Sequence, residues 1–128
     1  MTLAAKMYLP EGIQVPCVYL PTDIDLADIT PWAASFETAK QMVLDGRSPS
    51  LFFFVENSNH LSANLPKLVE LWEQKINFWL FYPKKPHLGT DLSRDTTWEQ
   101  VKKHGPKGTR QVGVDDRWSC LYFKNSEK

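Results

Sequence analysis

Residues 78–84 read Phe-Trp-Leu-Phe-Tyr-Pro-Lys, a run of apolar side chains ended by a proline. Residues 51–55, Leu-Phe-Phe-Phe-Val, are likewise apolar at every position. A strand with one face in water alternates apolar and polar residues, whereas an uninterrupted apolar run is typical of a strand buried on both faces. We therefore expect two central strands, over residues 51–55 and 76–82, in a parallel sheet covered by helices.

The segment between these two strands predicts a helix. It opens near Asn64, with Pro66 in its first turn, after a polar loop over residues 56–62. Its apolar residues recur at steps of three and four positions, which places them on one face. They are Leu65, Leu68, Val69 and Trp72. Strand, helix and strand together make a βαβ unit, whose crossover is expected to be right-handed.

Two further elements are expected nearer the N-terminus. Residues 14–20 form an apolar run that predicts a strand, ended by the turn residues 21–23. Pro16 has no N–H to donate, so this strand begins late or runs at the edge of the sheet at that position. Residues 23–28 fit a short strand or a loop equally well.

Residues 30–46 predict an amphipathic helix. Thr30 is a residue type favoured at the N-cap, and Pro31 would occupy the first helical position. Asp45 and Gly46 would end the helix. The apolar positions again recur at helical spacing. They are Trp32, Phe36, Ala39 and Val43.

The pattern changes in the C-terminal third of the chain. Thr96 and Glu99 have the spacing of a capping box, which predicts a short helix that ends at residues 104–106. Residues 110–114 and 118–123 are then the two strands of a hairpin. Because both faces of the last strand carry apolar groups, we expect this strand to insert against a neighbour.

Composition places the chain among ordinary globular proteins. Its 128 residues, 42% of them hydrophobic, predict one folded domain over residues 1–128. Basic and acidic side chains number 15 each, and this balance argues against nucleic acid as a partner. Cys17 and Cys120 lie in apolar runs, which favours buried thiols in a reducing compartment. With no signal peptide and no run of about 20 apolar residues, we expect a cytoplasmic protein that does not enter a membrane.

Ligands of open α/β sheets bind beyond the carboxyl ends of the strands. The loops at those ends are residues 21–23, 56–60 and 83–87. None of them carries the glycine-rich turn that lets a backbone approach a pyrophosphate, and Gly12 stands alone before the first strand. We therefore expect no NAD, FAD or S-adenosylmethionine cofactor.

Charged side chains in these loops are the first candidate site residues. Glu56 and His60 are a candidate acid–base pair, although a solvated loop that caps the following helix is the preferred interpretation. Lys84 and Lys85 follow a strand and are candidates for binding an anion. The alternative interpretation is a flexible charged loop that stays in solution. The other histidines lack partners at metal-ligand spacing, so we expect no metal site.

Residues 91–95, Asp-Leu-Ser-Arg-Asp, add a third group of candidates. The guanidinium of Arg94 is suited to a bound phosphate or to a carboxylate. The preferred interpretation is structural, with Arg94 tied to Asp115 or Asp116 and Asp95 capping the next helix. If the protein is an enzyme, Asp95 is a third acid–base candidate. No serine lies in a nucleophile-elbow context.

Three motifs mark the C-terminal half: YPK at residues 82–84, D-x-x-RD-x-x-W at 91–98 and DD-x-WS at 115–119. Over residues 78–123 the chain resembles a bacterial domain-of-unknown-function family with these motifs. The resemblance implies a truncated Rossmann-type domain, similar to the latter part of a methyltransferase fold, and it carries over no activity. Tyr122 stands where the family has arginine, so no anion-binding role transfers to that position.

We thus expect a three-layer Rossmann-like α/β sandwich, with a mostly parallel sheet of about five or six strands and an antiparallel C-terminal hairpin. The preferred function is a non-catalytic domain that binds a protein partner or a small anion, the anion through Lys84, Lys85 and Arg94. One alternative is a small degenerate transferase that uses strand-end loop residues. Another is a structural homodimer, with exposed Trp79 or Tyr122 at its interface.

Overall fold

The computed structural model describes residues 2–85 and 87–124. The strands are β1 (Gln14–Val18), β2 (Thr30–Ala33), β3 (Leu51–Phe54), β4 (Phe78–Pro83), β5 (Gly108–Gly113) and β6 (Trp118–Phe123). The helices are α1 (Leu3–Lys6), α2 (Phe36–Leu44), α3 (Ser58–Glu73) and α4 (Arg94–Lys102), with a short 3₁₀ turn η1 (His87–Gly89) before α4.

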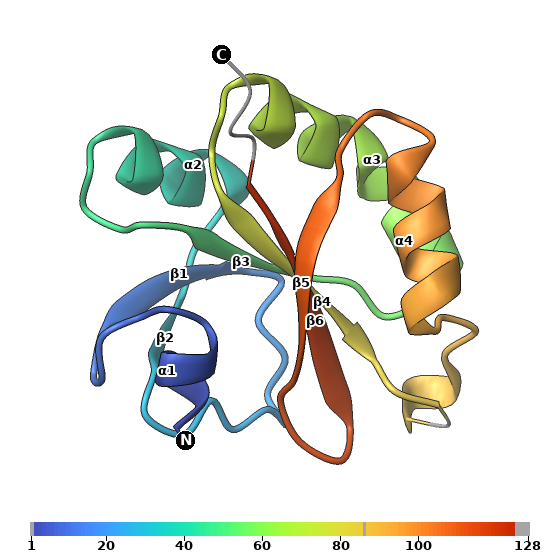
Figure 1. Cartoon of the computed structure of the whole chain (residues 1–128), viewed down its shortest axis with the longest axis horizontal. Helices are drawn as coiled ribbons and strands as arrows, with labels where there is room; N and C mark the ends of the chain where they lie inside the picture. The colour runs from blue at the N-terminus through green and yellow to red at the C-terminus, as the bar shows by residue number, and fades with distance from the viewer. Residues whose placement is uncertain (1, 86, 125–128) are drawn as a thin grey trace.

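The strands form one mixed sheet in the order β2-β1-β3-β4-β6-β5 (Figure 1). The first four are mutually parallel, whereas β6 runs antiparallel to both β4 and β5. The expected α/β class and the antiparallel C-terminal hairpin are therefore confirmed. The last strand also inserts against a neighbour as predicted, because β6 lies between β4 and β5.

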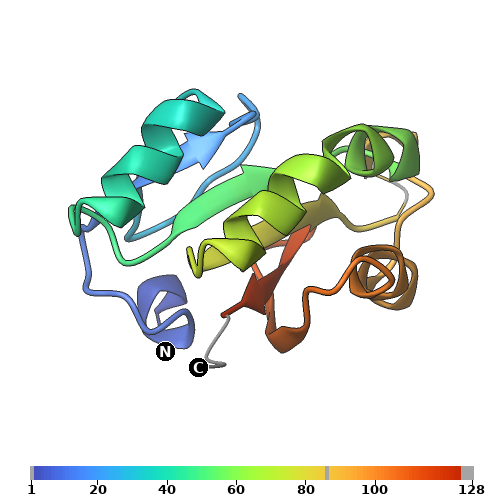
Figure 2. The ribbon, with the colours of Figure 1, turned by 90° about the horizontal axis from the view of Figure 1, so that it is seen from above.

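The two faces of the sheet are covered differently. Helices α2 and α3 lie on one face and the short α1 on the other (Figure 2). Residues of α2, α3 and α4 share one core cluster with the sheet. The second cluster is closed by α1 and by the connection from β1 to β2, which contributes Leu26 and Ile29. The second face is therefore covered mainly by irregular chain.

Burial of the central strands on both faces is confirmed. In β4, Phe78, Leu80 and Tyr82 face the first core, while Trp79 and Phe81 face the second. All four residues of β3 are buried as well. Successive side chains of a strand point to opposite faces, so only a run without polar residues satisfies two cores at once.

The prediction of a helix from Thr30 was wrong. Residues 30–33 form β2, which pairs in parallel with β1, and the helix begins only at Phe36. Its N-cap is Ser35, whose side chain accepts a hydrogen bond from the backbone N–H of Thr38. The residues 23–28, which fitted a strand or a loop, lie in the loop before β2.

Both other helix starts also differ from the prediction. Helix α3 begins at Ser58, six residues before Asn64, because the side chain of Asn57 accepts from the backbone N–H of His60. Pro66 consequently lies inside the helix. In α4 the capping box joins Ser93 to Thr96. Both misplaced starts come from a capping side chain that lies earlier than the one chosen from the sequence.

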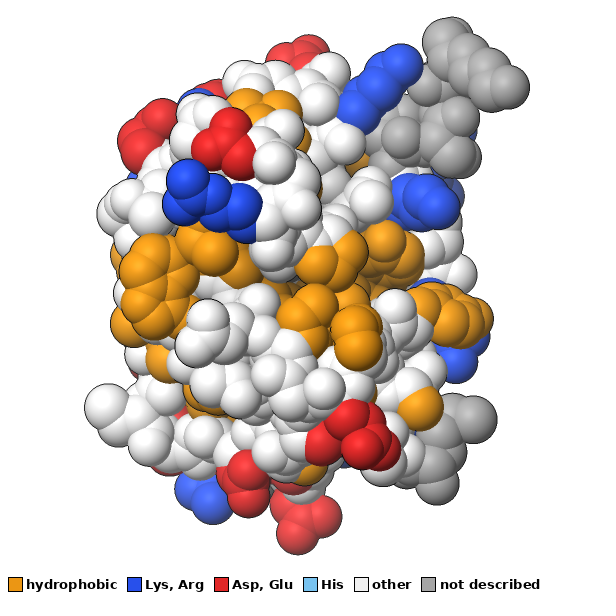
Figure 3. All heavy atoms as spheres, turned by 90° about the vertical axis from the view of Figure 1, so that its left-hand side faces the viewer, with side chains coloured by type: hydrophobic (Ala, Val, Ile, Leu, Met, Phe, Trp, Pro, Cys, Tyr) orange, Lys and Arg blue, Asp and Glu red, His pale blue; other side chains and the backbone are white. Residues whose placement is uncertain are grey.

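Strand β2 is the exposed edge of the sheet on the side shown in Figure 3, where hydrophobic side chains form a band. The N–H groups of Thr30 and Ala34 donate inward to the carbonyls of Ile13 and Cys17. Backbone N–H groups alternate in direction along a strand, so the nitrogen of Pro31 faces away from β1. As a proline nitrogen, it has no hydrogen to donate. A proline at this position limits pairing of the edge with another strand.

Candidate functional site

The loops at the carboxyl ends of the parallel strands meet. After β1, Asp23 places its Oδ2 2.7 Å from Nε2 of His87, which follows β4. Arg117, in the β5–β6 turn, lies with Nη1 3.6 Å from the same oxygen. These contacts hold His87 next to the loop after β1 and close to the β5–β6 turn, and two pockets open at this end of the sheet.

The first, the cationic pocket, has a volume of about 230 Å³. It brings together all three predicted anion-binding residues, Lys84, Lys85 and Arg94. The rest of its wall comes from β4, from the start of α4 and from the two strands of the hairpin. These residues are Tyr82, Leu92, Ser93, Gln111 and Ser119. No aspartate or glutamate is among the described residues that line it.

The cations keep donor groups available. Lys84 Nζ donates to the carbonyl of Asp115 at 2.7 Å, which uses one of its three N–H groups. Arg94 donates through Nε to Asp95, and within the described chain its terminal nitrogens have no acceptor. Asp95 itself lies in the first helical turn with its side chain exposed. The expected link from Arg94 to Asp115 or Asp116 is absent between these described residues.

Polar groups in the wall of the cationic pocket are held in place by hydrogen bonds between β5 and β6. Gln111 Nε2 donates to Ser119 Oγ at 2.8 Å, and Ser119 Oγ donates to the carbonyl of Val112 at 3.1 Å. Burial raises the pKa of Tyr82, against the lowering effect of hydrogen bonds with Ser119 and Gln111. The phenol therefore stays protonated at neutral pH and is able to donate.

The N-terminus of α4 adds to the positive potential. Its capping box satisfies the N–H groups of Ser93 and Thr96. The N–H groups of Arg94 and Asp95, at the first two helical positions, find no acceptor in the described part of the chain. Such free N–H groups and the helix dipole favour an anion at this end of a helix.

The second, the strand-end pocket, has a volume of about 630 Å³. It contains both Glu56 and His60 but not Asp95, so the three acid–base candidates do not form one group. His60 Nδ1 accepts from the backbone N–H of Glu56 at 3.2 Å. The Glu56 carboxylate makes no hydrogen bond or ion pair with the described residues.

Asp91 has a structural role that the sequence did not reveal. Its carboxylate accepts from the backbone N–H of Ser58 at 2.8 Å and from the Ser58 hydroxyl. It therefore holds the start of α3 against the loop that leads to α4. The side-chain and backbone hydrogen bonds from Ser58 lower the pKa of Asp91 below its ordinary value of 3.8.

This lowered pKa predicts a pH dependence of stability. The ionised carboxylate stabilises the fold above the ordinary pKa, and this contribution is lost as the pH falls through the lower pKa of the folded state. In thermal unfolding, Asp91→Asn should lower the melting temperature at neutral pH and reduce its decline on acidification. The exposed Asp116→Asn is the matched control. Equal decline in wild type and Asp91→Asn would contradict this role.

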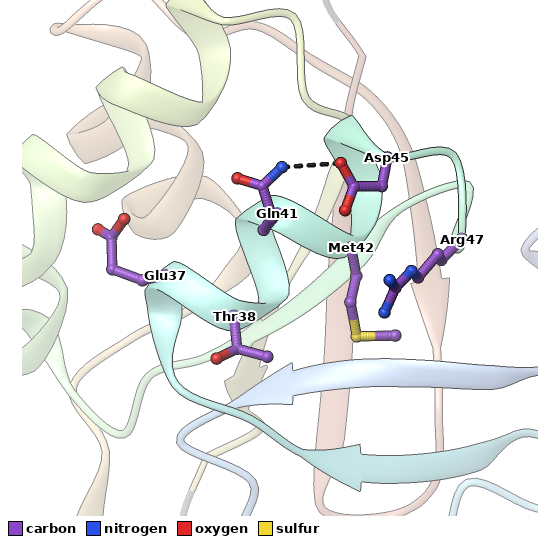
Figure 4. Close-up of a pocket in the computed structure, with 6 residues that line it drawn as sticks. All are labelled: Glu37, Thr38, Gln41, Met42, Asp45 and Arg47. Atoms are coloured by element: carbon purple, nitrogen blue, oxygen red, sulfur yellow. Dashed lines mark hydrogen bonds between the residues drawn. The ribbon is translucent and has the colours of Figure 1, made fainter.

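A third pocket, of about 430 Å³, lies along α2 (Figure 4). Gln41 Nε2 donates to Asp45 Oδ1 at 2.8 Å, and Glu37 pairs with Lys40 at 3.0 Å. In Figure 4, Glu37 points away from Met42 and Arg47. The side chains that line this third pocket therefore do not converge on one position where a ligand would bind.

Of the two aromatic residues predicted at a dimer interface, Trp79 and Tyr122, only Tyr122 is partly exposed. Trp79 is fully buried, so the expectation that it is exposed was wrong. Its ring stacks on the half-buried Tyr122 at a centroid distance of 4.5 Å. Among the described residues, no three His, Cys, Asp or Glu side chains group as metal ligands, and no helix there has the length and apolarity of a membrane span.

Comparison with known proteins returned neither a matching family model nor a matching curated protein. The function must therefore be inferred from the pockets themselves, since a fold by itself does not determine function.

Proposed function

We propose that this protein is a non-catalytic, three-layer Rossmann-like domain of the bacterial cytoplasm that binds a small oxyanion in the cationic pocket. The observation that carries the proposal is the convergence of Lys84, Lys85 and Arg94 on one pocket whose described wall contains no acidic residue. Charge-assisted hydrogen bonds from lysine and arginine are the strong contacts that proteins use for phosphates and carboxylates.

The neutral donors support an oxyanion of small size. Tyr82, a phenol that is protonated at neutral pH, supplies an O–H in the wall of the pocket. The free N–H groups at the start of α4 supply further donors. Three positive charges suit a dianionic phosphate better than a single carboxylate, because the attraction grows with the charge of the ligand.

The first test is calorimetric titration with inorganic phosphate. We expect phosphate to bind, and Lys85→Met or Arg94→Gln to weaken it about tenfold or more, the equivalent of one hydrogen bond to a charged group. Added salt should weaken binding as well. Lys103→Met, an exposed lysine at the other end of α4, is the control and should bind phosphate like wild type.

Two results would contradict the proposal. One is the absence of binding heat with phosphate, sulfate and succinate alike, provided that the protein is folded. The other is unchanged phosphate affinity in both Lys85→Met and Arg94→Gln. Because both side chains are exposed, neither substitution should affect folding.

The transferase alternative has less support. A general base acts on a proton within hydrogen-bond reach, and it is commonly oriented by a second side chain. Glu56 contacts His60 through its backbone N–H, and Asp95 lies on α4 and is not among the residues that line their pocket. Loss of a measured turnover in His60→Ala would nevertheless favour the transferase over a binding domain.

A further inference from the structure

We infer that the strand-end pocket is a second binding site, for an organic ammonium ion that has an apolar or aromatic body. This site is separate from the cationic pocket and does not depend on the proposed oxyanion binding. The inference starts from position and size. The pocket opens beyond the carboxyl ends of β1 and β3, and its volume of about 630 Å³ lies in the range of small-molecule sites.

The walls of the strand-end pocket are mainly apolar and aromatic. Apolar walls bind the body of a ligand, and aromatic faces also attract cations. The side chains of this kind come from the ends of β1 and β3, from η1 and from the start of β6. They are Tyr19, Leu20, Pro21, Phe54, Leu88 and Trp118.

Charge selects a cation over an anion. The carboxylate and imidazole side chains of the wall are Asp23, Glu56 and His60, and no lysine or arginine is among the described residues that line this pocket. Asp23 is already paired with His87 and lies near Arg117. Glu56 has no such partner in the described chain, so its carboxylate is the group left to pair with a ligand ammonium.

The site is also held in shape. The hydroxyl of Tyr19 donates to Asn64 Oδ1 and accepts from Lys67 Nζ, each at 3.2 Å. The ring of Tyr19 packs edge-on against Phe53 and His60. These contacts place the aromatic wall before any ligand arrives, which lowers the entropy cost of binding.

Backbone strain coincides with the same pocket. Of the five described non-glycine residues with positive φ, two line this pocket: Tyr19 and Leu88, with φ values of 60° and 57° in the left-handed region that favours glycine. Leu88 is also 49% exposed, so burial of its side chain does not account for its conformation. Strained residues of this kind cluster at ligand sites, where they position a side chain for contact.

The test compares phenethylamine with 2-phenylethanol and 3-phenylpropionate by calorimetric titration. The three probes share a phenyl ring and differ in charge. We expect phenethylamine to bind about tenfold or more tightly than the alcohol, as one charged hydrogen bond would give. Binding of the alcohol or the anion as tightly as the amine, or no binding of the amine to folded protein, would overturn the inference.

Glu56→Gln tests the assigned carboxylate. This exposed side chain has no partner in the described structure, and its backbone N–H to His60 is kept, so the variant should fold. We expect it to remove the preference for the amine over the alcohol, whereas Glu73→Gln, at the far end of α3, should keep the preference. Unchanged amine affinity in Glu56→Gln would overturn the inference.

Leu88→Gly tests the apolar wall of the strand-end pocket and leaves the charge of Glu56 unchanged. Glycine accepts the left-handed backbone, so we expect the melting temperature to stay the same or rise while amine and alcohol both bind several-fold more weakly. Full affinity in this variant would place the ligand elsewhere and contradict the site. Lys85→Met should leave amine binding unchanged, so failure of the oxyanion proposal and failure of this one are distinguishable.

Discussion

Phe81→Ala should lower the free energy of unfolding by about 3–5 kcal/mol, the usual cost of removing a buried phenylalanine. Phe81 is fully buried in β4. Its ring lies between those of Phe52 and Phe54, at centroid distances of 4.7 and 4.4 Å. Alanine would leave a cavity between two rings on a paired strand, where the backbone cannot close it. Urea unfolding followed by circular dichroism measures the loss.

The matched control is Leu44→Ala, at the C-terminal end of α2. Leu44 is 51% exposed, so its truncation should cost less than about 1 kcal/mol. Similar losses for the two variants would mean that the ring stack at Phe81 is not a principal part of the core. A changed slope of the urea transition would instead point to an altered denatured state.

Both thiols should be almost inert toward a thiol reagent such as DTNB in the folded protein. Burial raises the pKa of Cys17 from 9.0 to about 12, and it raises the pKa of Cys120 well above the same value. Since the thiolate is the reactive form, such a rise reduces it about a thousandfold near pH 8. Burial of both sulfurs slows the reaction further.

The measurement is the rate of DTNB labelling with and without urea. We expect the two cysteines to react together, at the rate of global unfolding, whereas Ser62→Cys on the exposed surface of α3 should react at once. The raised thiol pKa also predicts that stability falls as the pH rises above about 9, where only the unfolded chain ionises freely. Fast labelling of either native thiol in folded protein would contradict the burial described here.

The central sheet was predictable because its signal is local. The runs at residues 51–55 and 78–82 have no polar break, and only burial on both faces is compatible with that pattern. The apolar groups on both faces of residues 118–123 similarly required neighbours on each side. Helix starts were less predictable. Ser35, Asn57 and Ser93 cap the helices, yet each competes in the sequence with another acceptable cap nearby.

The edge strand β2 was missed for a different reason. Thr30 and Pro31 are as acceptable at a helix start as on a sheet edge, and only the pairing with β1 selects the strand. Tertiary contacts therefore overrode a local preference. Trp32, which seemed to continue the apolar stripe of the helix, is partly exposed on that edge.

The candidate sites were likewise predictable only in part from the sequence. Lys84, Lys85 and Arg94 were predictable as separate cations after a strand and before a helix. Their meeting with Gln111 and Ser119 depends on how β6 enters the sheet, which no local spacing encodes. Tyr82 was not predicted as a site residue, because it lies in an apolar run that indicates a buried strand. The left-handed backbone conformation of Tyr19 and Leu88 had no signal in the sequence.

The position of β6 also constrains the order in which the chain is able to fold during synthesis. Strand β5 takes its place in the sheet only through β6, because β6 separates it from β4. On the ribosome, β5 emerges first and has no partner until residues 118–123 follow. Pairing of β4 with β6 then joins segments far apart in sequence, which is a slow step. The hairpin half of the protein, and with it the wall of the cationic pocket, is therefore completed only after the last strand is made.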